Sequence, residues 1–179
     1  MPMPEEVKQP LRDALALLKS GKNAASLAIL ADLRQAHPNV GCVWLAAAFA
    51  HDRLGREEQA IPLYLKALKL DLDAAERHNA LIFLGSSYRN IGRLGNARRA
   101  LVKALSRDAL DPVAHLFLSL IEHDAGNPTA ALRRVALAYL DESANSHLRA
   151  FQHLLKRKFK ALRPVKPAAI VRRRTKPKP

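Results

Sequence analysis

The feature that most constrains this 179-residue chain is a set of four glycines at nearly even spacing. Gly21, Gly55, Gly92 and Gly126 are separated by 34, 37 and 34 residues. Each glycine follows one stretch with apolar residues at helical spacing and precedes another. A glycine in that place suits the left-handed residue that often ends a helix. The spacing therefore predicts four helix hairpins, and repeats of this period stack into a solenoid.

The residues around the glycines also repeat. A small residue lies five places after each glycine, at Ser26, Ala60, Ala97 and Ala131. Together with Trp44 and the run LGSSY at 84–88, this pattern resembles the tetratricopeptide repeat, W-x₂-L-G-x₂-Y…A-x₃-F…P. The segments LGREEQAIPLYLKAL, ALIFLGSSYRNIGRLGNARRAL and LSLIEHDAGNPTAALRR are similar to a small bacterial subfamily often called tetratricopeptide repeat group 5.

The resemblance and the composition predict the same layout. Helix-forming residues dominate and aromatic residues make up only 5%, which argues against a β sandwich or barrel. We expect an all-α, right-handed α-solenoid over residues 5–143, with repeats at about 8–40, 41–74, 78–111 and 112–143. A capping helix is expected at 144–162, because an open solenoid end exposes core. Residues 163–179 hold four prolines and no acid, which predicts a disordered tail. Pro62 should bend its helix without breaking it.

The resemblance also implies a ligand surface. In tetratricopeptide arrays the first helix of each hairpin lines a concave groove, at positions ten, six and three before the glycine. The candidate peptide-groove residues at these positions are Leu11, Leu15, Leu45, Phe49, Ile82, Ser86, Arg89, Leu116, Leu120 and His123. The alternative is that such residues pack against neighbouring helices. One subset of the family binds a C-terminal carboxylate, but the clamp positions here hold mainly apolar side chains. We therefore expect an apolar or amphipathic helical partner segment.

The net charge of +14 is unevenly distributed. Eleven Lys and Arg residues and no acid follow position 155, whereas residues 1–155 hold 19 basic and 16 acidic residues. A polyanion-binding tail is therefore a second hypothesis. Its residues are Lys156, Arg157, Lys158, Lys160, Arg172, Arg173, Arg174, Lys176 and Lys178. Nucleic acid or a ribosome, an anionic lipid surface, and an acidic protein remain open as its partner, as does a solvated tail with weak nonspecific effects.

The remaining motifs favour a protein that binds without catalysis. There is no phosphate-binding glycine loop or nucleophile elbow, and we expect no catalytic residue, no metal site and no cofactor. His51-Asp52 and His123-Asp124 fall in different registers of the repeat, and the single cysteine, Cys42, has no predicted base beside it. No run of about 18 apolar residues occurs and the N-terminus does not read as a signal peptide, so a cytoplasmic location is expected. A protein-interaction scaffold ranks first, a nucleic-acid or ribosome accessory second, and a chaperone for hydrophobic secreted segments third. Self-association is a further hypothesis.

Overall fold

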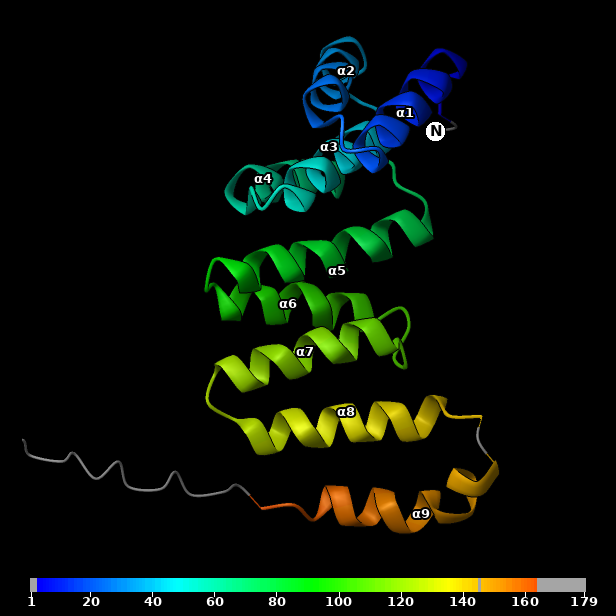
Figure 1. Ribbon diagram of the computed structural model, residues 1–179, viewed down its shortest axis with the longest axis vertical. Coiled ribbons are helices and arrows are strands. Elements are labelled where there is room, and N and C mark those ends of the chain that lie inside the picture. Colours follow the sequence, from blue (N-terminus) through cyan, green and yellow to red (C-terminus); the bar gives the residue numbers. More distant parts are fainter. Residues whose placement is uncertain (1–2, 145, 164–179) are drawn as a thin grey trace, which may run out of the picture.

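A computed structural model describes residues 3–144 and 146–163, and over these ranges the chain is helical without strands (Figure 1). The expected all-α solenoid of four hairpins is confirmed. Nine helices are found in the described part: α1 (Glu5–Lys19), α2 (Asn23–Ala36), α3 (Gly41–Arg53), α4 (Glu57–Ala67), α5 (Ala74–Asn90), α6 (Leu94–Leu105), α7 (Pro112–Asp124), α8 (Pro128–Glu142) and α9 (Ser146–Lys160).

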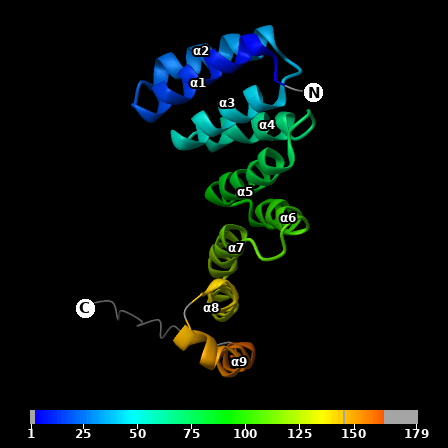
Figure 2. The same cartoon turned by 90° about the vertical axis from the view of Figure 1, so that its right-hand side faces the viewer.

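The helices form an elongated stack in which each contacts its neighbours in the chain (Figure 1). We call α1, α3, α5 and α7 the A helices and α2, α4, α6 and α8 the B helices. Each A helix packs on its own B helix, and successive A helices contact one another, whereas the backbones of the B helices in the described part do not approach one another closely. Figure 2 shows α5 displaced to one side of α6. The A helices therefore line one face of the stack, toward which the array must curve.

The predicted glycines form the four A-to-B turns. Gly21, Gly55, Gly92 and Gly126 have φ angles of 79°, 65°, 75° and 79°, in the left-handed region. The residue after each glycine donates its N–H to a carbonyl five residues back, as in Arg56 to His51 at 3.0 Å and Arg93 to Tyr88 at 2.8 Å. This is the bond of the Schellman motif, and its recurrence gives the hairpins a common geometry.

Small residues allow the helices of a hairpin to approach closely. Ser26, Ala60 and Ala97 are fully buried, as their place in the repeat predicts. Ser26 also donates its hydroxyl to the Ala14 carbonyl of α1 at 2.7 Å. On α5, a Cβ built on Gly85 would lie 2.6 Å from Cγ of Leu101, which is fully buried on α6. Any larger residue at such positions would push the two helices apart.

Local signals fix where helices begin. Asp73 and Glu76 form a capping box at the start of α5, and the Asp111 carboxylate accepts the Ala114 N–H at 2.8 Å at the start of α7. Pro62 lies inside α4, which continues through it to Ala67, so the helix is not broken.

The final helix, α9, packs only on α8 among the described residues. It takes the place of the predicted capping helix. Arg133 of α8 donates to the Phe159 carbonyl at 3.1 Å and to the Leu162 carbonyl at 2.5 Å, and Gln152 donates to the Leu140 carbonyl at 2.5 Å. These bonds fix the orientation of α9 on the stack. Nearly all of the predicted tail, from residue 164, lies outside the described residues.

Candidate functional site

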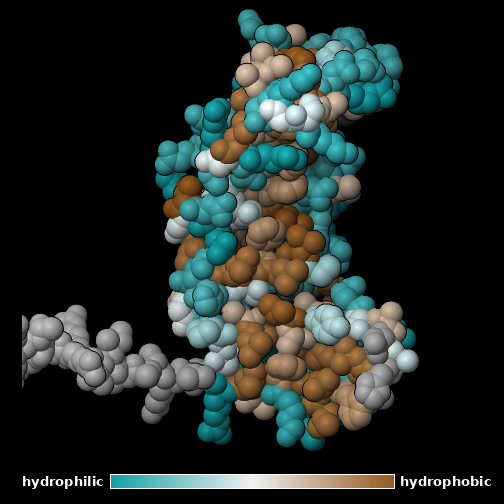
Figure 3. Space-filling view, viewed as in Figure 1, coloured by the Kyte–Doolittle hydropathy of each residue, from teal (hydrophilic) through white to brown (hydrophobic). Residues whose placement is uncertain are grey.

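The surface formed by α1, α3, α5 and α7, below called the A face, carries apolar side chains in contact with solvent. An A helix is covered by its own B helix and by neighbouring A helices, so its exposed side chains lie on this face. Figure 3 looks onto the side that bears α5 and α7 and shows hydrophobic surface gathered over α5 to α9. This concentration makes the A face the candidate site.

On α7 the exposed apolar residues form a line. Val113, Leu116 and Leu120 are 47%, 48% and 41% exposed, and their spacing of three and four residues places them on one side of the helix. The opposite side of α7 carries buried Leu118 and Ile121. The helix is thus apolar on both sides, and only one side is covered by the fold.

In the middle of the array the A face carries aromatic rings. The rings of Phe49 on α3 and Phe83 on α5 lie 5.3 Å apart between centroids, and the Tyr64 ring lies 6.3 Å from that of Phe83. Tyr64 is fully buried, whereas Phe49 and Phe83 are half-buried. Such a cluster offers edge and face contacts to an incoming apolar side chain.

Polar contacts between successive repeats border these apolar residues. Arg89 donates to the Asp124 carboxylate at 2.6 Å, and Asn90 donates to the Glu57 carboxylate at 2.9 Å. Asp52 accepts the Ser87 hydroxyl at 2.7 Å. Burial raises the pKa of Asp52, while the Ser87 hydrogen bond acts in the opposite direction. These pairs join α5 to α7, α4 and α3 and hold the A face in one shape.

The predicted groove residues differ in how far they reach solvent. Leu11 and Ile82 are 7% and 5% exposed and belong to the core, so their side chains offer little surface to a ligand. Leu45, Phe49, Ser86 and Arg89 are half-buried. The most exposed members are Leu15, Leu116, Leu120 and His123.

Three further side chains on the A helices contact solvent but were not predicted as groove residues: Phe83, Phe117 and Val113. A sequence signal for two of them exists. Phe83 and Phe117 both lie nine places before a repeat glycine, where α3 has Ala46. A bulky aromatic that recurs at one repeat position, where another repeat has alanine, indicates a surface position rather than a tightly packed one.

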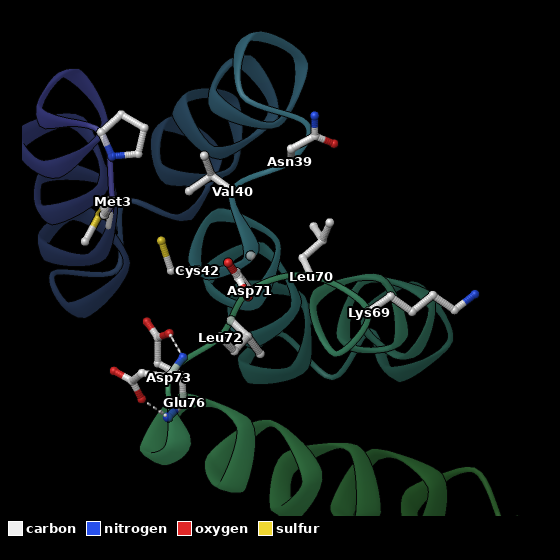
Figure 4. Close-up of a pocket in the computed structure, with 12 residues that line it drawn as sticks. Met3, Asn39, Val40, Cys42, Lys69, Leu70, Asp71, Leu72, Asp73 and Glu76 are labelled. Carbon is white, nitrogen blue, oxygen red and sulfur yellow. Dashed lines mark hydrogen bonds between the residues drawn. The ribbon is translucent and has the colours of Figure 1, made fainter. Parts of the chain in front are cut away.

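A separate pocket of about 640 Å³ lies between the start of α1, the α2–α3 loop and the α4–α5 loop (Figure 4). Its acidic residues include Asp73 and Glu76, which are occupied with each other in the capping box. Cys42 also lines it, and burial raises the pKa of the thiol. The thiol is therefore protonated at neutral pH and a poor nucleophile.

A buried ion pair, which the sequence did not predict, lies between α7 and α8. Glu122 is 6% exposed, and Arg134 donates to its Oε1 from Nη2 at 2.7 Å and from Nε at 3.1 Å. Glu122 occupies the repeat position that holds Tyr88 in the preceding repeat. A carboxylate in the place of that buried tyrosine was the available signal for a buried partner.

The predicted polyanion-binding residues are only partly described. Lys156, Arg157, Lys158 and Lys160 lie on α9, where Lys156 pairs with Asp141 of α8. The other five, Arg172, Arg173, Arg174, Lys176 and Lys178, lie outside the described residues.

Residues 3–144 and 146–163 hold neither a metal-binding cluster nor a membrane-spanning helix. No cluster of three or more His, Cys, Asp or Glu side chains there could hold a metal ion. None of the helices described has the length and apolar character needed to cross a membrane.

Comparison with known proteins gives a family and a fold. Residues 41–157, more than half of the chain, match the family described as Tetratrico peptide repeat. No curated protein matches the chain.

Solved structures show the same fold at low sequence identity. The structure of MamA MSR-1 aligns with a TM-score of 0.63 at 19% identity, over 72% of this chain and 72% of its own. A second MamA crystal structure aligns with a TM-score of 0.63 at 18% identity, over 88% of this chain and 90% of its own. The APC/C hetero-tetramer Cut9–Hcn1 aligns with a TM-score of 0.59 at 18% identity, over 84% of this chain and 30% of that chain.

Proposed function

Because this chain belongs to the tetratrico peptide repeat family, we propose that it is a non-catalytic scaffold that binds a segment of a partner protein on its A face. Family membership and fold support protein binding as the general role. The use of the A face, and an apolar or amphipathic helical segment as its occupant, are the specific parts of this proposal.

One observation carries it: the uncovered line of Val113, Leu116 and Leu120 on α7, beside an A face that already presents Phe49 and Phe83. When a partner covers apolar side chains that are in contact with water, the free energy falls by about 25 cal/mol per Å² of apolar surface buried. An amphipathic helix presents apolar residues every three or four positions, which is the spacing of the line on α7. The inter-repeat pairs, including Arg89 with Asp124, keep this surface preformed.

The test is to place charge on the line and measure partner binding. The double substitution Leu116→Glu and Leu120→Glu should abolish recovery of partners by affinity purification and mass spectrometry, because a helix docked on α7 would bury both carboxylates. Both side chains already contact solvent, at 48% and 41% exposure, so the melting temperature should stay close to that of the wild type.

A matched control is Val102→Glu, since Val102 is 53% exposed on α6, a B helix outside the A face. The control should keep every partner. Recovery of the same partners by the folded double variant would refute the use of the A face. Phe49→Glu is a weaker probe, because the contact of its ring with Phe83 makes loss of folding a competing outcome.

The partner could be another copy of the chain, and light scattering decides this. A dimer that becomes monomeric with Leu116→Glu and Leu120→Glu but not with Val102→Glu would identify the occupant of the A face as a second copy.

A further inference from the structure

We propose that α9 is an attachment surface for an anionic lipid bilayer, independent of the A face. The helix combines exposed apolar side chains with a high density of positive charge. Phe151 and Leu154 are 48% and 43% exposed, although α9 already has an apolar side packed on α8. The sequence of the helix, SHLRAFQHLLKRKFK, carries five Lys and Arg residues and no acid.

The exposed half of α9 is divided lengthwise. Phe151, Leu154 and Lys158 follow one line at a spacing of three and four residues, and His153, Arg157 and Lys160 follow a second line at four and three. All six of these side chains are exposed to solvent. An apolar strip flanked by cations is the pattern of a helix that lies in a membrane interface, with its lysine and arginine stems extended toward the headgroups.

Packing against α8 keeps the apolar and basic lines of α9 on its solvent side. Leu148, Leu155 and Phe159 are half-buried on the opposite side of α9, and Arg133 of α8 donates to the carbonyls of Phe159 and Leu162. Lys156 is paired with Asp141. Arg157, Lys158 and Lys160 have no ion pair among the described contacts and remain for a ligand. The orientation of α9 is therefore set before any surface is met.

The positive charge of α9, together with its exposed apolar residues, favours an anionic bilayer over other ligands. A second copy of this chain would bring two helices without acids together, and the net charge of +14 adds to the repulsion. A nucleic acid would use the cations, but phosphate contacts do not require Phe151 or Leu154 beside them. An anionic bilayer uses both properties at once. The sequence after α9 adds six further Lys and Arg residues between 164 and 179 and no acid.

The test is co-sedimentation of the full chain with vesicles of phosphatidylcholine alone and of phosphatidylcholine mixed with phosphatidylglycerol. We expect binding to the mixed vesicles only, weakening as salt rises. Arg157→Gln with Lys158→Gln should reduce the partition coefficient by about fivefold for each cation removed. Phe151→Ser with Leu154→Ser, which leaves the charge unchanged, should reduce it by about tenfold.

The control is Val102→Ser, which removes an equally exposed apolar side chain from α6 and should leave vesicle binding at the wild-type level. A second readout does not depend on loss of an apolar contact. When the mixed vesicles are added, the tryptophan emission of Phe151→Trp should shift to shorter wavelength, by more than that of the wild type, which contains only Trp44. Vesicles of phosphatidylcholine alone should cause no such shift.

Three results would overturn the proposal. One is absence of binding to the mixed vesicles. Another is equal binding by the Phe151→Ser, Leu154→Ser variant, since this would mean that charge alone acts. The third is complete displacement from the vesicles by polyuridylate with no blue shift in Phe151→Trp, which would identify the surface as a nucleic-acid site.

Discussion

Two helical glycines, Gly85 inside α5 and Gly95 in the first turn of α6, differ in how closely the neighbouring helix approaches them, which allows a test of the packing within a hairpin. A methyl group on Gly85 would lie 2.6 Å from Cγ of Leu101, and Leu101 is fully buried. A methyl group on Gly95 would meet only the end of the Arg99 side chain, at 3.8 Å.

We predict that Gly85→Ala destabilises the protein by about 1–3 kcal/mol because it overpacks the α5–α6 contact. Gly95→Ala should be neutral or stabilising by up to about 1 kcal/mol, because alanine favours the helix. Urea unfolding followed by circular dichroism measures both. Equal effects of the two substitutions would mean that α5 and α6 do not approach as closely as the structure shows.

Asp52 carries a half-buried carboxylate at the border of the A face. Burial raises its pKa above the ordinary value of 3.8, so the folded state binds a proton more tightly than the unfolded chain does. The wild type must then lose stability relative to an uncharged variant as the pH rises through the interval between the unfolded and folded pKa values.

We therefore predict that Asp52→Asn is more stable than the wild type near neutral pH, and that the difference shrinks as the pH falls through the interval from the folded to the unfolded pKa. Asparagine can still accept the Ser87 hydroxyl, so the hydrogen bond at 2.7 Å is kept. Urea unfolding of both proteins across the acidic range tests this. A difference that stays constant with pH would show that the carboxylate is not desolvated.

At the scale of the helix, two aspartates cap A helices but differ in the number of interactions that they make. Asp73 caps α5 within a capping box and is exposed. Asp111 caps α7 and also bonds to His78 of α5, so it links two repeats. Burial raises the pKa of Asp111, but the bonds from His78 and the backbone outweigh it and lower the pKa overall.

Asp73→Ala should cost about 1 kcal/mol, as loss of an N-cap usually does. Asp111→Ala should cost about 2 kcal/mol, because it also leaves His78 without its partner. The contribution of Asp111 is present above the unfolded pKa and is lost as the pH falls through the folded pKa. Urea unfolding at neutral and acidic pH distinguishes the two, and equal costs at neutral pH would exclude the link to His78.

The helices could be predicted because their boundaries are encoded locally. Gly21, Gly55, Gly92 and Gly126 mark the turns, and the small residues at Ala60 and Ala97 mark the crossings, so spacing alone was sufficient. Exposure was not predictable in this way, because helical periodicity does not distinguish a side that faces the next A helix from a side that faces water. Ile82 and Leu116 occupy the same repeat position, yet one is buried and the other is 48% exposed. Their difference depends on the neighbouring repeat, which a single repeat position does not specify.

Over the whole molecule, burial at equivalent repeat positions decreases toward the C-terminus. Ala60 and Ala97 are fully buried, whereas Ala131 at the same position is 9% exposed. Tyr64 and Leu101 are fully buried, whereas Val135 is only half-buried. Since stability in a repeat array is approximately a sum of local and nearest-neighbour terms, opening should begin at this end.

We predict that amide hydrogen exchange is slowest in α3 to α6 and fastest in α9. Arg133→Ala should make exchange in α9 about tenfold faster, because it removes the hydrogen bonds to the Phe159 and Leu162 carbonyls. The matched control is Arg99→Ala, because Arg99 is exposed and bonds only to Asn96 of its own helix among the hydrogen bonds described. Exchange in α3 to α6 should not change in Arg133→Ala, since these helices do not contact α9, and exchange in α9 should not change in Arg99→Ala, which alters only α6. Uniform acceleration of all helices by Arg133→Ala would instead mean that the array opens as a single cooperative unit, and α9 would then be part of its core stability.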